Sequence, residues 1–393
     1  MSLCLIKIVT SFLIKRIIYI IPSTDTNMEQ FIKPPVEVRY SEELSALENN
    51  DKARRPANWR LSPSAVRTFI LGGDVDTPDG KVKIKRKFYG NDALVERAII
   101  TLAGNRGLML VGEPGTAKTM LSELLSAACC GISTNTVQGT AGTTEDMIKY
   151  SWNYALLLSK GPCREALVPS PLLIGMEKGI FARFEEITRT PAEMQDSLIS
   201  VMSDQILNIP EMGDEGLVLA KPGFNIIGTA NTRDKGVNEM SGALKRRFNF
   251  ETVEPVRDVR LEKEIIVREA SELAKTANIS CPVDTDVAEL LAVTYHELRE
   301  GITSDGTVIE RPNAVMSTAE AVSVYYQALC HSWYYGNGRI EPALLTEGLL
   351  GAVCKENKDD LEKLRAYFRT VSKEKSKAGD LWKEYIKTAD LLR

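Results

Sequence analysis

The stretch GEPGTAKT, residues 112–119, holds the residue types that bind phosphate groups. In a phosphate-binding loop, backbone N–H groups and a helix N-terminus point at the phosphates, a lysine reaches the β and γ oxygens, and a hydroxyl binds Mg²⁺. Lys118 and Thr119 occupy the last two positions, but Ala117 stands where the pattern has glycine. Ala117 keeps its N–H donor, so no hydrogen bond to phosphate is lost. The alanine costs about 1–2 kcal/mol of conformational energy only if the loop requires a positive φ there.

Two adjacent carboxylates, Glu185 and Glu186, end a second stretch, GIFARFEE. Hydrolysis needs one carboxylate that holds hydrated Mg²⁺ and another that polarises the attacking water. We assign Glu185, with Thr119, to the metal ion and Glu186 to the water. Aspartate is usual in the metal-binding role, and glutamate places its oxygens about 1.5 Å farther out, a difference that a coordinated water can span. We expect Arg183, an unusual charge in a buried strand, to reach the surface or a subunit contact, or to lie at a sheet edge.

Three apolar runs position these groups, and each ends in polar residues: GLMLVG, GIFARFEE and FNIIGTAN. The helical pattern TMLSELLSAACCG follows the first run directly and ends at Gly131, which predicts a strand, a loop and a helix. In an open α/β sheet, ligands bind at the carboxyl ends of parallel strands. The sequence therefore predicts an α/β fold with one site shared by the three strand ends.

Four segments in this order resemble the MoxR branch of the AAA+ ATPases, which is related to chelatase motor subunits and dynein-type modules: LMLVGEPGTAKT, FARFEEITRTPAEMQDSLISVM, FNIIGTANT and ALKRRFNFETVEP. The resemblance covers roughly residues 86–330. An alanine before the loop lysine is familiar in that branch. The resemblance implies an ATP-driven ring, usually a homo-hexamer, in which a neighbouring subunit completes each site.

The fold that this resemblance implies is a P-loop AAA+ parallel-sheet ATPase domain followed by an α-helical lid and C-terminal helices. Segment 205–223 has an acidic, glycine-containing tip and predicts a β-hairpin. It is similar to a hairpin insertion that related AAA+ ATPases carry before the strand that corresponds here to FNIIGTAN. We expect five parts along the chain: an extension over 1–27, an arm over 28–85, the αβ ATPase core over 86–253, the lid over 254–335 and a C-terminal helical region over 336–393.

Matching positions in the family imply roles for three further residues. Asn231 matches the sensor that helps to place the attacking water, and Arg247 matches the arginine presented to the next subunit's γ-phosphate. Arg246 is a close competitor of Arg247. Simpler interpretations are that Asn231 caps the following turn and that both arginines are surface charges. The loop residues that we expect at the ATP are Gly112, Glu113, Pro114, Gly115, Thr116, Ala117, Lys118, Thr119 and Met120.

One departure from the family concerns the lid. Relatives carry a second sensor arginine at the start of a lid helix, within an SPRA-like stretch, whereas the matching stretch here is VMSTAEAV, residues 315–322. No arginine stands there, and Arg311 lies just upstream as a candidate substitute.

The N-terminal 27 residues contain the only run that could suggest a membrane. Lys15 and Arg16 would lie near the centre of any span, where each costs about 2.5–3.5 kcal/mol. We therefore expect no spanning helix. The simplest interpretation is that residues 1–27 precede the true start codon, and a membrane-surface anchor is the alternative.

Composition narrows the function further. Lys and Arg total 49 against 53 Asp and Glu, without a long like-charged run, which argues against nucleic acid as the partner. Seven cysteines without a CxxC pair are typical of reduced thiols in a cytosolic protein.

These observations together predict a cytosolic ATPase with ATP and Mg²⁺ as cofactors that remodels or matures a client protein or complex. The resemblance implies that a von Willebrand A-domain protein is a partner of such ATPases. Two alternatives stay open. One is a nucleotide-gated binding scaffold with slow turnover, suggested by Glu185 and the missing lid arginine. The other is a restriction-type DNA-associated motor, against which the absence of a basic face argues.

Overall fold

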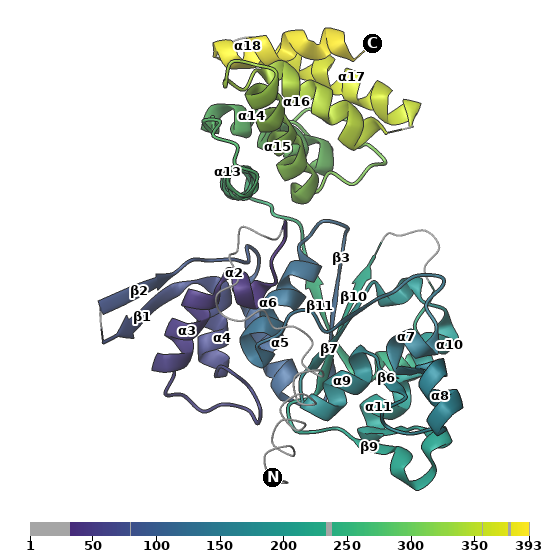
Figure 1. The fold of residues 1–393 in the computed structure, drawn as a ribbon. Helices are drawn as coiled ribbons and strands as arrows, with labels where there is room; N and C mark the ends of the chain where they lie inside the picture. Colours follow the sequence, from purple (N-terminus) through teal and green to yellow (C-terminus); the bar gives the residue numbers. More distant parts are fainter. Residues whose placement is uncertain (1–31, 79, 233–237, 356, 376–378, 393) are drawn as a thin grey trace.

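The computed structural model describes residues 32–78, 80–232, 238–355, 357–375 and 379–392 (Figure 1). The predicted extension over residues 1–27 lies outside these ranges. Within them, no helix is both long enough and apolar enough to cross a membrane.

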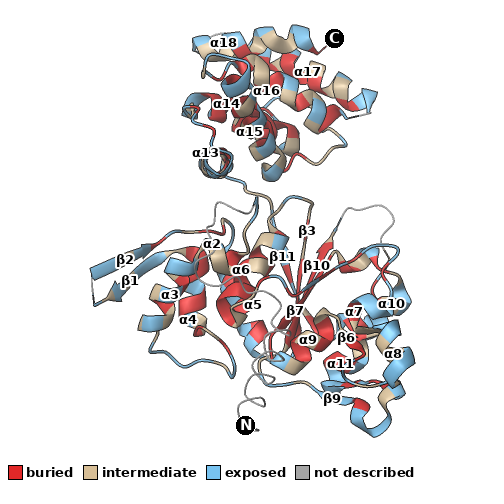
Figure 2. Ribbon diagram, in the orientation of Figure 1, coloured by how far each residue is buried: buried red, intermediate tan, exposed pale blue. Residues whose placement is uncertain are grey.

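A five-stranded parallel sheet in the order β11-β3-β10-β7-β4 forms the centre of the ATPase core. Its strands are β3 (Gly107–Gly112), β4 (Thr136–Gln138), β7 (Phe181–Glu185), β10 (Asn225–Asn231) and β11 (Phe248–Val253). The strands β3, β7 and β10 are the three predicted apolar runs, and they are buried along almost their whole length (Figure 2). Continuous burial is typical of strands covered on both faces, and the predicted α/β fold is confirmed.

Helices cover both faces of this sheet. Side chains alternate across a strand: Leu108 and Leu110 of β3 face a hydrophobic cluster with α4, α5 and α6, whereas Met109 faces another with α9 and α11. The helices are α4 (Pro63–Leu71), α5 (Asp92–Ala103), α6 (Lys118–Cys130), α9 (Pro171–Lys178) and α11 (Leu198–Asp204). The helix α6 ends at Gly131, whose φ of 72° suits glycine.

The arm before the core packs on α6, and its apolar side chains belong to the same hydrophobic cluster as those of α5. It contains α2 (Val36–Arg39), α3 (Ser41–Asn50) and α4, followed by an antiparallel hairpin of β1 (Gly73–Thr77) and β2 (Gly80–Ile84). Ser62 caps α4 by accepting a hydrogen bond from the Ala65 N–H.

Two hairpins project from the core. The first joins β5 (Tyr150–Trp152) to β6 (Leu167–Pro169) through α8 (Tyr154–Lys160). The second pairs β8 (Ile206–Asn208) with β9 (Leu217–Leu219) around a 3₁₀ tip and confirms the hairpin predicted over 205–223. The remaining short elements of the core are α7 (Glu145–Ile148), η2 (Ile187–Arg189), α10 (Ala192–Asp196), η3 (Pro210–Gly216) and α12 (Gly242–Lys245).

The chain leaves β11 for a helical region at the carboxyl-end edge of the sheet (Figure 1). Its first three helices are α13 (Val259–Thr276), α14 (Thr285–Glu300) and α15 (Thr318–Tyr334), which lie within the range predicted for the lid. The rest are α16 (Pro342–Leu349), η4 (Leu350–Cys354), α17 (Lys358–Glu374), α18 (Asp380–Lys387) and η6 (Thr388–Leu391). One hydrophobic cluster runs through all of them, from Ile266 to Leu392, so the predicted lid and C-terminal region pack as one unit.

Candidate active site

The phosphate-binding loop lies between β3 and α6, as the sequence predicts. The Nζ atom of Lys118 donates hydrogen bonds to the carbonyl oxygens of Gly112, at 3.1 Å, and Glu113, at 2.6 Å. The hydroxyl of Thr116 also donates to the Glu113 carbonyl, at 2.9 Å. The first N–H groups of α6 have no partner within a helix, so the loop presents them where an anion would bind.

Ala117 has a φ of 66° and caps α6 in the left-handed region. The loop therefore does require the positive φ at which alanine costs about 1–2 kcal/mol relative to the right-handed conformation. The N–H donor of Ala117 remains in place. The alanine consequently makes the loop more costly to form without removing a phosphate contact.

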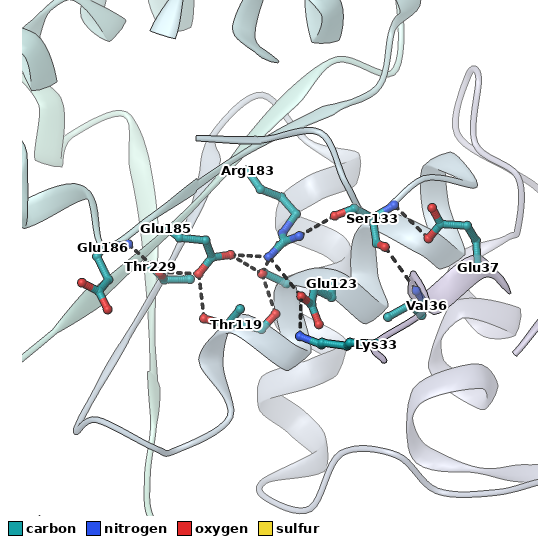
Figure 3. A network of polar contacts seen from close by, with 11 residues as sticks. Lys33, Val36, Glu37, Thr119, Glu123, Ser133, Arg183, Glu185, Glu186 and Thr229 are labelled. Carbon is teal, nitrogen blue, oxygen red and sulfur yellow. Dashed lines mark hydrogen bonds and ion pairs between the residues drawn. The ribbon is translucent and has the colours of Figure 1, made fainter. Parts of the chain in front are cut away.

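Glu185 ends β7 directly beside the loop (Figure 3). Its Oε2 atom accepts hydrogen bonds from the hydroxyls of Thr119, at 2.8 Å, and Thr229, at 2.7 Å. Its Oε1 atom accepts one from the Ser122 hydroxyl, at 2.7 Å. Thr119 and Glu185, which the sequence assigned to the same metal ion, are thus in contact.

Arg183 does not reach the surface, a subunit contact or a sheet edge, so that expectation was wrong. Its side chain is 3% exposed, and β7 lies between β10 and β4. Its Nη2 atom binds Oε1 of Glu185 at 2.6 Å, Nε donates to the Ser122 hydroxyl at 2.9 Å, and Nη1 donates to the Ser133 carbonyl. Residues two apart share a face of a strand, and Glu185 therefore supplies the counter-charge that makes a buried arginine tolerable.

The charge of Glu185 follows from this environment. Burial raises the pKa of its carboxyl, but the Arg183 guanidinium and the hydroxyls of Ser122, Thr229 and Thr119 outweigh burial, so the pKa lies below its ordinary value. Glu185 is therefore a carboxylate near neutral pH.

Glu186 points away from Glu185 (Figure 3). Its φ of 52° is left-handed, its N–H donates to the Thr229 hydroxyl at 3.0 Å, and its Oε2 atom pairs with Nε of Arg189 at 2.8 Å. The side chain is about one-third exposed, at 34%. Left-handed backbone in a residue with a side chain costs on the order of 1–3 kcal/mol and is concentrated at functional sites.

The strand register brings Asn231 to the site but not the two arginines. Asn231 ends β10 opposite Gly112 of β3. The N–H of Gly107, at the other end of β3, donates to the Arg247 carbonyl at 2.9 Å. Because a strand rises about 3.3 Å per residue, Arg246 and Arg247 lie about 16 Å from the loop, at the amino-end edge of the sheet.

The two arginines also differ from each other. Arg247 is held within its own subunit, since Nε donates to the Ser203 hydroxyl and Nη1 to the Ala243 carbonyl, both at 2.6 Å. The side chain of Arg246 is exposed.

A cavity of about 680 Å³ lies between the loop, the linker after β11 and the lid. Its lining includes Gly112, Glu113, Thr232, Val253, Arg299 and Met316. This volume is within the usual range for small-molecule sites, about 300–1,000 Å³.

The lid touches the loop at the stretch that lacks the family's arginine. A Cβ atom added at Gly115 would fall 2.3 Å from Cβ of Ser317, the N-cap of α15, and 3.7 Å from Cβ of Ala319. Arg311 lines the cavity, but it is exposed and its Nη2 atom donates to the Glu300 carbonyl at 2.5 Å. Residues 315–322 contain no basic residue, so no basic side chain of this stretch faces the loop.

Thr119 and Glu185 fit a hydrated Mg²⁺ ion. They offer hydroxyl and carboxylate oxygens, which this cation prefers. Because the Thr119 hydroxyl donates its proton to Glu185, the lone pairs of the Thr119 oxygen remain available to an ion on the side of the loop.

Two family models match the chain, one on each unit of the fold. Residues 107–248 match an AAA domain of the dynein-related subfamily, and residues 260–393 match the C-terminal domain of YehL-like AAA+ ATPases. The uncharacterized protein YehL of Escherichia coli K12 is 48% identical over 337 residues, which cover 86% of this chain and 91% of that protein. The chain belongs to the YehL-like AAA+ ATPases.

The chain also shows more distant similarities. Chaperone MoxR1 of Mycobacterium tuberculosis is 27% identical over 200 residues, about half of each chain (50% and 49%), and the predicted relation to MoxR-type ATPases is confirmed. The crystal structure of NtrX from Brucella abortus in complex with ADP aligns with a TM-score of 0.44 at 14% identity, over 77% of this chain and 62% of that chain. The YehL-like model spans the lid and the C-terminal helices together, as does their hydrophobic cluster.

Proposed function

We propose that this YehL-like ATPase hydrolyses ATP with Mg²⁺ in a ring of identical subunits, and that the hydrolysis remodels or matures a client protein. The observation that carries the proposal is the hydrogen bond from Thr119 to Glu185, with Glu186 as the next residue. This contact joins the phosphate-binding loop to the strand that ends in two carboxylates. Bound Mg²⁺ would neutralise charge on the phosphate oxygens.

The residues of the loop hold the nucleotide in this mechanism. Lys118 exchanges its hydrogen bonds with the loop carbonyls for the phosphate oxygens, and the N–H groups at the start of α6 bind the same oxygens. Thr119 and Glu185 would hold the Mg²⁺ ion. Glu186 leaves Arg189 and accepts a proton from the attacking water, which Asn231 orients.

A neighbouring subunit completes the site. Arg247, with Arg246 as its competitor, lies about 16 Å from the loop of its own subunit, which is too far to touch a phosphate there. An arginine at the opposite edge of the sheet can act on the γ-phosphate of the next subunit. This geometry supports a ring, and we infer the homo-hexamer that the family usually forms.

Exposed apolar side chains support a protein client. Tyr154 and Leu158 of α8 are 73% and 90% exposed, and Leu217 and Leu219 of the second hairpin are 57% and 62% exposed. Apolar side chains gathered on projecting elements are typical of protein-binding surfaces. The similarity to a protein named chaperone MoxR1 points the same way, and a von Willebrand A-domain protein is the partner that we propose.

The deciding experiment measures ATP binding and hydrolysis in the Glu186→Gln variant. We expect normal ATP affinity and hydrolysis at least ~10²-fold slower, the loss typical of a missing general base. Glu193→Gln, an exposed glutamate of α10, is the matched control and should hydrolyse ATP like the wild type. Lys118→Ala should abolish detectable ATP binding.

Three results would redirect the proposal. Equally slow hydrolysis by the wild type and Glu186→Gln, with ATP still controlling partner binding, would establish a nucleotide-gated scaffold. Normal ATP affinity of Lys118→Ala would refute the loop assignment. Salt-dependent stimulation of turnover by DNA would indicate a DNA-associated motor.

A further inference from the structure

We propose that Arg183 is a positioning residue that fixes Glu185 in place, so that Glu185 acts on the Mg²⁺ site through the Thr119 hydroxyl and not as a direct ligand. The inference rests on the proposed Mg²⁺-dependent ATPase function and assigns a task to a residue outside the loop. Arg183 touches neither nucleotide nor metal ion in this arrangement. It acts through the carboxylate two residues further along β7.

The first observation is that the Glu185 carboxylate is saturated. An ionised carboxylate has two oxygens with about four lone-pair directions. Arg183 donates to Oε1 at 2.6 Å, and Thr119 and Thr229 donate to Oε2 at 2.8 and 2.7 Å. The fourth donor is the Ser122 hydroxyl, whose one proton is shared between Oε1, at 2.7 Å, and the Thr119 carbonyl, at 2.8 Å. A metal ion bound directly to Glu185 would have to displace one of these four donors.

The second observation is that Arg183 is held at every end of its guanidinium (Figure 3). Besides Glu185, it donates to the Ser122 hydroxyl and to the Ser133 carbonyl, and Glu123 lies 4.0 Å from Nη2. Ser133 is itself fixed, because its N–H donates to Glu37 of the arm at 3.0 Å. The guanidinium therefore has no second position to move to, and Glu185 stays where Arg183 holds it.

The third observation is the charge of the pair. Both side chains are almost fully buried, at 3% and 5% exposed, so their charges are poorly screened by solvent. An unpaired carboxylate beside the loop would repel the nucleotide and attract Mg²⁺, which would make nucleotide binding depend strongly on the ion. The neutral pair removes most of this dependence while keeping the oxygen that orients Thr119.

The test measures ADP affinity by calorimetry on the full chain, once with saturating Mg²⁺ and once with EDTA. The ratio of the two affinities reports how strongly metal and nucleotide binding are coupled. In Arg183→Met the carboxylate loses its counter-charge, and we expect the ratio to rise at least ~5-fold, the lower end of typical coupling between two ligands. Arg183→Lys retains the charge and should restore a ratio near that of the wild type.

A merely structural role of Arg183 would give a different result. Local disorder would weaken ADP binding equally with and without Mg²⁺ and leave the ratio unchanged. An unchanged ratio in folded Arg183→Met would therefore overturn the proposal.

A double variant keeps the test decisive even if Arg183→Met fails to fold. Replacing both members of a buried ion pair by neutral side chains of similar shape is often tolerated, and Arg183→Met with Glu185→Gln leaves the summed charge at zero. We expect its affinity ratio to stay within about twofold of the wild type, a small fraction of typical ligand coupling. A ratio that falls to about one, the value without coupling, would make Glu185 a direct metal ligand and refute the inference. Failure of the wild type to bind ADP would instead count against the proposed ATPase.

Discussion

Two carboxylates, one in the ATPase core and one in the lid, are buried beside an arginine, and they are used differently. Glu185 is 4% exposed and Glu262 of α13 is 0% exposed. Each also accepts a hydrogen bond from a threonine hydroxyl, Glu262 from Thr318 at 2.7 Å. Glu262 binds both terminal nitrogens of Arg299, at 3.0 and 2.6 Å, whereas Glu185 binds a single nitrogen of its arginine.

The difference separates a structural ion pair from a positioning one. Arg299 of α14 also donates to the carbonyls of Met316 and Val256, so the lid pair joins three helices and the linker from the core. In the core, the Arg183 guanidinium donates to three acceptors, two of which are Ser122 and Ser133. The second carboxylate oxygen of Glu185, Oε2, accepts hydrogen bonds from hydroxyls, including that of Thr119 at the loop. The same two residue types thus stabilise the lid and orient the loop.

The largest effect that we expect concerns the origin of the arginine: the lid pair takes both partners from one chain, whereas the proposed ATPase mechanism takes an arginine from a neighbouring subunit. Arg247→Ala should bind ATP normally but lower kcat on the order of 10³-fold or more, as for arginines that act on a neighbour's phosphate. Mixing it with Lys118→Ala should restore part of the activity. Steady-state hydrolysis of the separate and mixed variants measures both effects.

The control for this prediction is Arg246→Ala. Rescue by mixing with Arg246→Ala instead would show that the exposed arginine is the trans-acting one. Undiminished hydrolysis by dilute monomers would leave no role for a neighbour at all.

The next largest effect concerns the lid pair. Glu262→Gln leaves the Arg299 charge buried without a counter-charge, and we expect the free energy of unfolding to fall by about 3–5 kcal/mol. Denaturant unfolding measures this. The double variant with Arg299→Met should regain most of the loss, and folded Glu262→Gln should keep the Mg²⁺ dependence of ADP binding seen in the wild type. A stability like that of the wild type would mean that the pair does not hold the lid together.

The sequence predicted the parts of the core that leave a local pattern. Apolar runs that end in polar residues predicted β3, β7 and β10, and their parallel arrangement predicted that Thr119, Glu185 and Asn231 share one edge of the sheet. The sequence did not predict whether Ala117 has a left-handed φ, because the residue type alone does not show whether the loop requires it.

The sequence did not predict the buried ion pairs, because their partners come from distant segments. Spacing of two along a strand would have placed Arg183 and Glu185 on one face, but Ser122 and Ser133 enter only through the packing of α6 and the loop after it. Arg299 and Glu262 are 37 residues apart on two helices. A buried charge in an amphipathic helix resembles a surface charge until the partner helix is placed.

A smaller effect should follow from giving the lid the charge that it lacks at the loop. Ala319 is exposed and lies 3.7 Å from a Cβ added at Gly115. Ala319→Arg should tighten ATP binding roughly tenfold, since a hydrogen bond to a charged group contributes about 1.5–3 kcal/mol and part is lost in ordering the side chain. Calorimetry is the measurement, and Ala53→Arg adds the same charge far from the site. Equal affinities of both variants would show that the lid does not close on the nucleotide.

The smallest effect tests the outer end of the network that holds Arg183. Figure 3 shows the pair that Lys33 of the arm forms with Glu123. The two charged groups are 3.3 Å apart, but the Lys33 side chain is 76% exposed. Exposed pairs contribute about 0–1 kcal/mol, so Lys33→Ala should change the free energy of unfolding by less than ~1 kcal/mol and leave the ratio of ADP affinities with and without Mg²⁺ unaltered. The buried contacts to Ser122 and Ser133 still fix the guanidinium in this variant, which is why no change should reach Glu185. If Lys33→Ala shifts that ratio while unfolding is unaffected, the arm transmits its position to the metal site, and Arg183 is a movable link rather than a fixed support.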